Sequence, residues 1–498
     1  MNKKQMKNLF YIFIILHALF WTMLQTLRHV MSIDAMEAIS WGELLSFGTN
    51  KHPPFTGWLA APLYNIFGHH EFAIYLLGSL CVLIGFIYIY KLAKNFLSEE
   101  KAFCSVMILE ACHYYTYSIF LDNFNCNIIL LAFFPAAAYY FYKSIHKNKV
   151  SDWIFFGLTS GLAFLSKYQI IFLLFALFIY LLLENREQFK KKGIYIAFAV
   201  GLLTVLPHLI WVFKHDFFCL AYMFERAESK FVEFVLWKNI FDRIFYPLKF
   251  YADQILAVCG CIAMYILTAI QAKNIAFWNK NISKSDKTFI LTIAFVPIIA
   301  QGFVGIISSS RVPGTWGSMM MGFIGIVLFA FLPINFKENT YKFFVKLSFF
   351  AMAGMLTAVG TFLITQKKIF ISLPYEKIFT EINSQWDFET NNAPLKYVAG
   401  DLKYIFAYRY YNDKHPKVIL DTFGYKSPFE NHDDILKSGA IIILDEENDL
   451  DKIARDRMVL LPKDYKINPK NYTYNICNKF NSCKDYEFYY AIIPPLNQ

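Results

Sequence analysis

Long apolar segments alternate with short charged ones along the first three quarters of the chain. Residues 102–121 and 193–213 are nearly free of charge, and 153–183 is interrupted only by Lys167, which predicts two short helices meeting there. A helix needs about 20 apolar residues to cross a bilayer core, so the pattern predicts about eleven membrane spans. The segments without any Asp, Glu, Lys or Arg are 9–27, 72–90, 124–142, 254–272, 288–310, 312–336 and 347–366.

Composition agrees with a membrane protein. Apolar residues make up 56% of the 498 residues and charged residues 17%, whereas soluble domains carry about 25% charged residues. No small-residue cleavage site follows the first apolar segment, so we expect that segment to remain as a helix. The fold class predicted is therefore mainly α, a polytopic membrane helix bundle.

Lysine and arginine define the predicted orientation, because they concentrate in cytoplasmic loops. With the N-terminus inside, every inner loop is basic, and the outer connections at Asp122, Lys167 and Arg311 carry few positive charges. This bias largely explains the net charge of +10 and gives no reason to predict nucleic-acid binding. The inner loops are 1–8, 91–101, 143–152, 184–192, 272–287 and 337–346.

The last quarter of the chain changes character. From residue 367 to 498, charges are interspersed and short β-like segments alternate with helical stretches such as 433–437, which predicts a small α/β domain on the outer side. The membrane domain is then 1–366, with long outer loops at 28–71 and 214–253. The predicted strand segments are 397–399, 418–420, 440–444 and 489–493.

Two cysteines of the tail, Cys477 and Cys483, lie close together in the sequence. An oxidising outer compartment allows them to form a disulfide. Two free surface thiols are the alternative, and the sequence leaves both open.

The first outer loop begins with a predicted interfacial helix that carries Asp34 and Glu37. Their i, i+3 spacing places both carboxylates on one face, where they can act as base and metal ligand or as base and orienting group. The simpler interpretation is a solvated helix face. We expect the apolar side chains of this stretch to face the membrane; they are Met36, Ile39, Leu44 and Phe47.

A proline pair follows in the same loop. Pro53 and Pro54 stop a helix and hold an extended turn, which positions Lys51 and His52 at the membrane surface as candidate substrate-binding groups. An ordinary turn with an exposed histidine is the alternative.

Two further outer connections carry ionisable groups. Asp122 lies between two apolar spans, where charges are costly and tend to be functional; opposite Asp34 it would complete a two-carboxylate site. Its alternative role is a helix N-cap. Lys167, followed by Tyr168, is a candidate phosphate ligand, and residues alone favour a lysine that snorkels to the interface.

Arginines supply the remaining candidates. Arg226 lies in the outer segment 214–253, and Arg311 is the only charged residue between Lys287 and Lys337. A guanidinium suits a phosphate because it binds in a bidentate way. An interfacial anchor beside Trp316 is the alternative for Arg311. No P-loop, zinc motif, Ser-His-Asp signature or dinucleotide fingerprint is present.

These motifs together resemble a known family. Asp34 after the first span, the HisProPro motif at 52–54 and the acid Asp122 are similar to the C-type (GT-C) glycosyltransferases. More closely, the chain is similar to the bacterial branch of glycosyltransferase family 39 and its relatives, a group that includes protein O-mannosyltransferases and lipid A aminoarabinose transferases. The segments GLAFLSKYQ (161–169), YYNDKHPKVILD (410–421) and SPF (427–429) also resemble that group.

The resemblance implies a sugar donor linked to a polyprenyl phosphate and an acceptor that is lipid A, another glycolipid, a glycan or a protein. Asp34 would serve as base or orient the acceptor, and Lys167 or Arg311 would stabilise the departing phosphate. This chain departs from the family at Ala35 and Asn123, where relatives often carry a second acid. A divalent metal ion is compatible with the carboxylates, but the sequence identifies no metal site.

The implied location is the bacterial inner membrane, with the N-terminus cytoplasmic and the tail periplasmic. The alternative function is a transporter or flippase of lipid-linked sugars. Inverted repeats and helices broken at mid-membrane would favour it, and the sequence shows neither.

Overall fold

The computed structural model describes residues 3–28, 30–220, 236–273, 282–308, 311–334, 336–365, 373–420, 428–458 and 461–496. Internal contacts divide the chain into two compact units. The membrane unit comprises Met1–Gln25 and Ser46–Val359, and the sheet unit comprises Thr26–Leu45 and Gly360–Gln498. The longest segments outside the described residues are 221–235 of a predicted outer loop, 274–281 of a predicted inner loop, 366–372 at the start of the tail and 421–427 within the tail.

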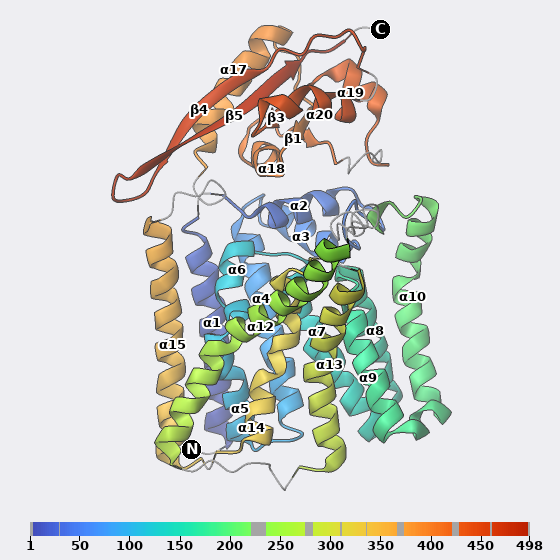
Figure 1. Cartoon of the computed structure of the whole chain (residues 1–498), viewed down its shortest axis with the longest axis vertical. Helices are drawn as coiled ribbons and strands as arrows, with labels where there is room; N and C mark the ends of the chain where they lie inside the picture. Colours follow the sequence, from blue (N-terminus) through green and yellow to red (C-terminus); the bar gives the residue numbers. More distant parts are fainter. Residues whose placement is uncertain are drawn as a thin grey trace. The chain divides into compact units, whose positions relative to one another are not determined.

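Eight helices among the described residues are long and apolar enough to cross a membrane. They are α1 (Lys3–Gln25), α4 (Phe72–Ala93), α7 (Cys126–Lys147), α10 (Lys192–Lys214), α12 (Leu236–Ala272), α13 (Lys284–Ser308), the 3-10 helix η4 (Gly314–Phe323) continued by α14 (Ile324–Phe331), and α15 (Glu338–Thr365). Two shorter apolar helices, α8 (Val150–Ser166) and α9 (Ile170–Glu184), meet at Lys167 as predicted. The protein is a multi-pass membrane protein, and α12 crosses the other helices obliquely (Figure 1).

The single span predicted at 102–121 is wrong. This stretch is broken into α5 (Glu99–Met107), two 3-10 turns and α6 (Tyr117–Asp122). Glu110 lies in the break, fully buried, and its carboxylate contacts the imidazole of His17, which is also fully buried. A buried carboxylate is tolerated where a partner stabilises it, and here α1 supplies that partner.

Small residues allow close helix packing in the membrane unit. A Cβ added at Gly157 of α8 would lie 2.4 Å from the carbonyl oxygen of Ala197 in α10, and one at Gly161 would lie 2.7 Å from Cβ of Thr204. Two glycines four residues apart form the small-residue spacing that lets membrane helices approach each other. The contact between α8 and α10 therefore depends on these positions lacking a side chain.

Gly157→Leu should destabilise the protein, because the leucine would meet the main chain of α10. Overpacking costs about 1–3 kcal/mol, so we expect a lower thermal midpoint for the detergent-solubilised chain. Gly354→Leu on α15 is the matched control, since nothing lies within 4 Å of a Cβ added there. Equal midpoints for the two variants would contradict this packing.

The sheet unit is built on a five-stranded mixed sheet in the order β2-β1-β3-β5-β4. β1 pairs in parallel with β2 and β3, whereas β5 pairs antiparallel with β3 and β4. The strands are β1 (Tyr397–Gly400), β2 (Lys417–Val418), β3 (Ala440–Leu444), β4 (Lys470–Cys477) and β5 (Cys483–Ile493). The strands predicted at 397–399, 440–444 and 489–493 and the helix at 433–437 are confirmed. The strand predicted at 418–420 is confirmed only at Val418, since β2 ends there, and β4 is an additional strand.

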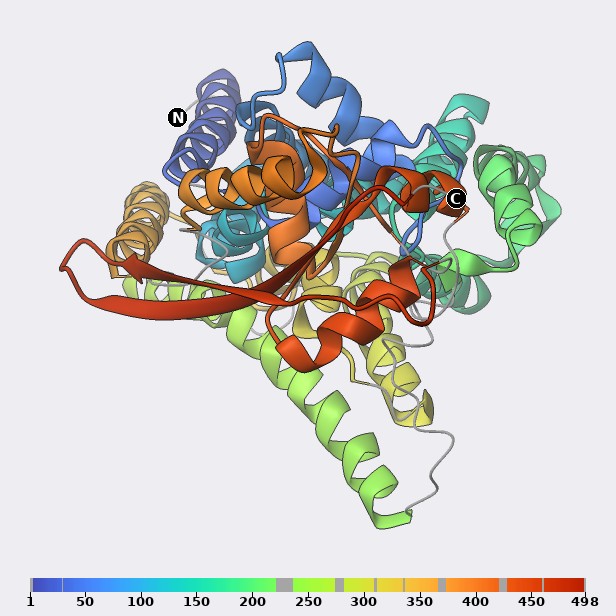
Figure 2. The same ribbon diagram turned by 90° about the horizontal axis from the view of Figure 1, so that it is seen from above.

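Helices cover both faces of this sheet (Figure 2). Ala399 and Ile442 pack with Leu450 and Ala454 of α20 on one face, and the ring of Tyr404 in α18 lies 4.9 Å from that of Phe488 on the other. All of β3 is buried for this reason. The helices are α17 (Tyr375–Thr390), α18 (Leu402–Tyr411), α19 (His432–Ser438) and α20 (Leu450–Arg457).

The sheet unit also contains α2 (Ile33–Glu43), which comes from the first outer loop. Ser40 Oγ and the Tyr410 hydroxyl are hydrogen-bonded at 2.8 Å, and Glu43 forms an ion pair with Arg409. Met36 and Ile39 are buried in the protein, at 1% and 0% exposed. The expectation that they face lipid is wrong, because protein atoms cover this side of the helix.

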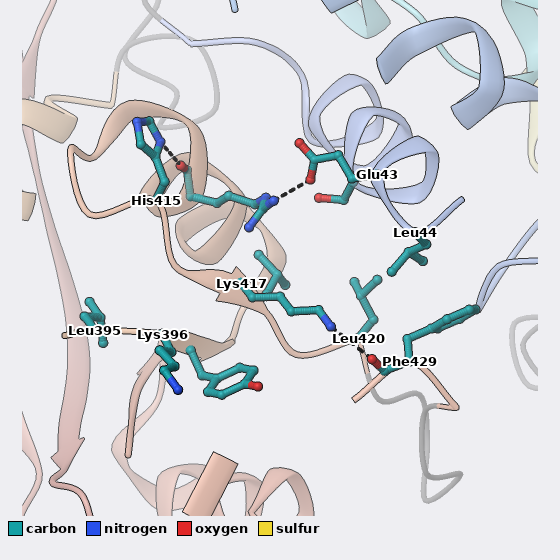
Figure 3. Close-up of a pocket in the computed structure, with 12 residues that line it drawn as sticks. Glu43, Leu44, Leu395, Lys396, His415, Lys417, Leu420 and Phe429 are labelled. Carbon is teal, nitrogen blue, oxygen red and sulfur yellow. Dashed lines mark hydrogen bonds and ion pairs between the residues drawn. The ribbon is translucent and has the colours of Figure 1, made fainter. Parts of the chain in front are cut away.

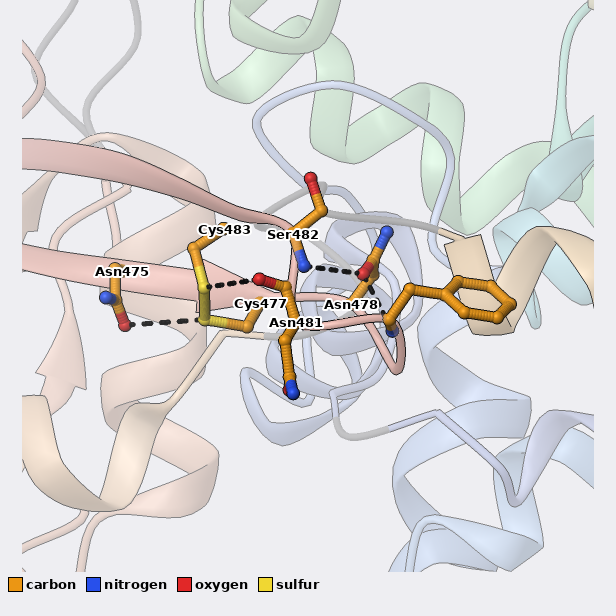
Figure 4. The surroundings of a disulfide bond; sticks show 7 residues. Asn475, Cys477, Asn478, Asn481, Ser482 and Cys483 are labelled. Atoms are coloured by element: carbon orange, nitrogen blue, oxygen red, sulfur yellow. Dashed lines mark hydrogen bonds between the residues drawn. A yellow bond between two sulfur atoms is a disulfide. The ribbon is translucent and has the colours of Figure 1, made fainter.

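A disulfide joins Cys477 to Cys483 and closes the hairpin of β4 and β5 (Figure 4). Inside the loop, Asn478 Oδ1 accepts hydrogen bonds from the main-chain nitrogens of Phe480 at 2.9 Å and Ser482 at 3.1 Å. The two cysteines therefore form a disulfide and are not free surface thiols, the two alternatives that the sequence left open.

The disulfide predicts a defined pattern of thiol labelling. In a Cys259→Ser background, which removes the exposed free thiol, a membrane-impermeant maleimide should label intact spheroplasts only after reduction. Cys477→Ser should expose Cys483 and allow labelling without a reductant, because the tail is predicted to face outward. Labelling of the unreduced parent chain, or none in the Cys477→Ser variant, would contradict this prediction.

Candidate functional site

Asp122 ends helix α6 and lines a small cavity in the membrane unit together with Asn127. The N-cap of α7 is Asn125, whose Oδ1 accepts hydrogen bonds from the main-chain nitrogens of Asn127 at 3.0 Å and Ile128 at 3.1 Å. Capping therefore falls to Asn125 and not to Asp122. The half-buried Asp122 lines this cavity, whose volume of about 10 Å³ has room for about one water molecule.

Lys167 lies at the C-terminal end of α8 and is buried, with 7% of its surface exposed. Its ammonium donates a hydrogen bond to Asn127 Oδ1 at 2.7 Å and lies 5.1 Å from the centre of the Trp316 ring. The snorkelling favoured from the residues alone is wrong, because an amide and an aromatic face stabilise the cation inside the protein. Through Asn127, Lys167 adjoins the cavity that Asp122 lines.

Tyr168 connects three segments of the membrane unit. Its hydroxyl lies 2.8 Å from His208 Nε2 and 3.4 Å from Cys219 Sγ. His208 Nδ1 lies 2.7 Å from the carbonyl oxygen of Phe47, so Nδ1 carries the proton and Nε2 accepts from Tyr168. These contacts hold Phe47, which precedes the HisProPro motif by five residues, against α10.

The turn with Lys51 and His52 is shaped by Thr49. The hydroxyl of Thr49 accepts hydrogen bonds from the main-chain nitrogens of Lys51 at 3.1 Å and His52 at 3.0 Å, and donates to the His52 carbonyl at 2.7 Å. Pro54 then precedes helix α3 (Phe55–Ile66). Gly48 is required upstream, since a Cβ there would lie 2.0 Å from the Trp211 ring. Lys51 and His52 are both half-buried.

Asp34 and Glu37 lie on α2 in the sheet unit. The N-cap is Ser32, whose Oγ accepts a hydrogen bond from the Ala35 nitrogen at 3.2 Å, and Asp34 lies in the first turn, where a negative charge is favoured. The Asp34 side chain is exposed, whereas Glu37 is only 3% exposed. The two carboxylates thus have different environments, because Asp34 is exposed and Glu37 lies inside the protein.

The structure brings some of the predicted site residues close together. Asp122, Lys167 and the unpredicted Asn127 and Trp316 form one cluster in the membrane unit. Arg311 is exposed at the start of the segment that leads to η4, and Arg226 lies outside the described residues. No group of three or more His, Cys, Asp or Glu side chains within the described residues has an arrangement that could hold a metal ion.

Residues 51–211 match the family model described as dolichyl-phosphate-mannose-protein mannosyltransferase. The predicted family resemblance is confirmed. The mannosyltransferase-like segment contains the Lys51–His52 turn, Asp122, Lys167 and Tyr168. Asp34 and Arg311 lie outside it.

Two curated relatives from Rhizobium johnstonii are similar to the chain. Lipid A galacturonosyltransferase RgtD is 27% identical over 186 residues, which cover 37% of this chain and 39% of the relative. Lipopolysaccharide core galacturonosyltransferase RgtA is 22% identical over 189 residues, 37% of this chain and 38% of the relative. The matched stretch thus spans about two fifths of the length of these relatives.

Among solved structures, the apo oligosaccharyltransferase of Archaeoglobus fulgidus aligns over 93% of this chain and 73% of its own, at 12% identity and a TM-score of 0.48. A TM-score below 0.5 does not establish a shared fold.

Thr49→Val should weaken the turn that carries Lys51 and His52. Valine keeps the shape but leaves two main-chain N–H groups without their acceptor, at a cost of about 1–3 kcal/mol. Thr49→Ser keeps the hydroxyl and serves as the control. Thermal unfolding of the purified chain should show a lower midpoint for Thr49→Val alone; equal midpoints for both variants would contradict the role of the hydroxyl.

Proposed function

We propose that the protein is a membrane glycosyltransferase that moves a sugar from a polyprenyl-phosphate donor to an acceptor of the cell envelope. One observation carries the proposal: the segment that matches the mannosyltransferase family contains a buried lysine, Lys167, whose ammonium is hydrogen-bonded to Asn127, a residue that lines a small cavity together with Asp122. Burying a cation inside a membrane protein costs free energy. A role in stabilising a lipid phosphate would explain why the chain places a lysine there.

Lys167 takes the role of the phosphate-stabilising group. An ammonium carries three N–H donors, and the hydrogen bond to Asn127 holds it in one orientation before the substrate binds. Such preorganised charge is most effective where water is scarce. Arg311, which is exposed, would bind the donor phosphate from the aqueous side, and Lys51, His52, Tyr168 and Arg226 would complete the substrate contacts.

Asp34 is the proposed base. Its exposed carboxylate can accept the proton of an acceptor hydroxyl, whose oxygen then attacks the anomeric carbon as the bond to the phosphate oxygen breaks. The phosphate leaves with the bonding electron pair, and Lys167 stabilises its charge. Direct displacement inverts the anomeric centre. Glu37, inside the protein, and Asp122, at its cavity, would orient the reactants.

The names of the relatives favour particular substrates. RgtD and RgtA are named for galacturonosyl transfer to lipid A and to the lipopolysaccharide core. We therefore take a polyprenyl-phosphate galacturonic acid as the first donor to test and a lipid A or core saccharide as the first acceptor. The proposed location is the bacterial inner membrane, with the reaction and the C-terminal tail on the periplasmic side.

Asp34→Asn should abolish transfer while the protein stays folded. General base catalysis contributes about 10²–10⁴-fold, so we expect kcat to fall by at least about a hundredfold. Asp433→Asn is the matched control, because Asp433 is also an exposed acid in the first turn of a helix.

Lys167→Met should likewise lower kcat. Lys452→Met is its control and should leave kcat unchanged, because Lys452 lies on the exposed face of α20.

The readout is mass spectrometry of the envelope glycolipids from a deletion strain that expresses each variant, together with transfer by the purified chain. Full activity of Asp34→Asn would refute its role as the base. The flippase alternative would be supported by a different result. The deletion strain would lack the glycan, and the purified chain in proteoliposomes would translocate the donor across the membrane without transferring its sugar.

A further inference from the structure

The sheet unit contains a cavity of about 640 Å³ that none of the predicted site residues lines (Figure 3). Glu43, the last residue of α2, and the following Leu44 lie on one side of it. His415, which precedes β2, and Lys417, which begins β2, lie on the other. This volume falls in the range of small-ligand sites. The lining residues are Ser40, Glu43, Leu44, Leu395, Lys396, Tyr397, Arg409, His415, Lys417, Val418, Leu420 and Phe429.

Basic groups dominate the charge of this cavity. Arg409 is held by an ion pair with Glu43 and by a 2.9 Å hydrogen bond that it donates to the Pro416 carbonyl. Lys417 makes no ion pair within the described residues. Its ammonium donates to the carbonyl oxygen of Phe429 at 2.9 Å, which leaves N–H donors for another acceptor.

The charge of Lys396, the third cation of the cavity, is neutralised by Asp434, which does not line the cavity. Lys396 Nζ lies 3.4 Å from Asp434 Oδ1, and the Tyr397 hydroxyl donates to Asp434 Oδ2 at 2.6 Å. The hydrogen bond from Tyr397 is the main reason that the pKa of Asp434 is lowered, so this carboxyl stays charged at neutral pH. The uncompensated positive charge of the cavity is therefore that of Lys417.

Apolar side chains also line the cavity. They are Leu44, Leu395, Val418, Leu420 and Phe429. Sugar rings combine an apolar C–H face with polar edges, so a cavity lined by both apolar and basic groups matches a sugar that carries a negative charge.

We propose that this cavity binds an anionic saccharide, a sugar ring that carries a phosphate or a carboxylate, with Lys417 as its main charged contact. That the saccharide is part of the acceptor rests on the proposed function. Glu43 lies nine residues beyond Asp34 on α2, which is about 13 Å along the helix axis and on its opposite side. The cavity therefore recognises a part of the acceptor that is remote from the reacting hydroxyl.

Isothermal titration of the full chain in detergent tests the site directly. The probes are glucose 1-phosphate for the phosphate arm, glucuronic acid for the carboxylate arm, glucose as the neutral ring and inorganic phosphate as the anion without a ring. We expect one of the two anionic sugars to bind at least about tenfold more tightly than both glucose and phosphate.

Variants assign the binding to the cavity. Lys417→Ala should weaken the anionic sugar by about tenfold, as expected for the loss of one charge-assisted contact, and Lys417→Arg should retain it. Lys452→Ala is the matched control, since Lys452 is an exposed lysine of the same unit that does not line the cavity. Equal affinity for charged and neutral probes, or unchanged affinity in Lys417→Ala, would overturn the proposal.

The outcome can be separated from that of the proposed function. Asp34→Asn should bind the anionic sugar as the parent chain does, because Asp34 is remote from the cavity. In transfer assays, Lys417→Ala should raise the KM for the acceptor and leave kcat unchanged, which is the signature of a lost binding contact. If the chain binds the anionic sugar but transfers none, the proposed function is refuted and the saccharide site remains. If Lys417→Ala binds the sugar more weakly but transfers normally, the bound saccharide is not part of the acceptor.

Discussion

A charge inside a membrane protein persists only where another segment of the chain supplies it with a partner, because hydrocarbon cannot solvate it. In the membrane unit, Lys167 is held by Asn127 and Trp316, and Glu110 is held by His17. Each contact joins segments that are distant in the sequence. The pairing of Glu110 accompanies a broken helix, and that of Lys167 lies at the junction of α8 and α9, where the proposed phosphate ligand is held.

The first outer loop illustrates a second consequence of such pairing. Its helix α2 belongs to the sheet unit, where Glu43 and Ser40 contact consecutive residues of α18, Arg409 and Tyr410. The proposed base Asp34 is thus carried by an element that the C-terminal sheet stabilises. Under the proposed function, the tail would contribute to transfer through α2, and Ser40 and Glu43 of the same helix line the basic cavity.

Local patterns were sufficient for much of the fold and for part of the site. The apolar segments, the two short helices that meet at Lys167 and four of the five strands follow from periodicity and charge along the chain. β4 was missed because it is an edge strand, and polar residues such as Lys470 and Asn471 hide its alternation. Asn127 and Trp316 were missed because no spacing relates them to Lys167, and Arg409 and Lys417 because their cavity forms only when α2 packs on the tail.

By itself, the sequence determined that this is a multi-pass membrane protein with a small α/β tail, and which loops carry ionisable groups. Hydropathy is a local property, so each span could be recognised from its own residues. Only the tertiary structure decided that Lys167 turns inward, that Met36 and Ile39 are covered by protein and that Glu110 meets His17. Those outcomes depend on partners from remote segments, and the free energy of burying a polar group depends on what surrounds it.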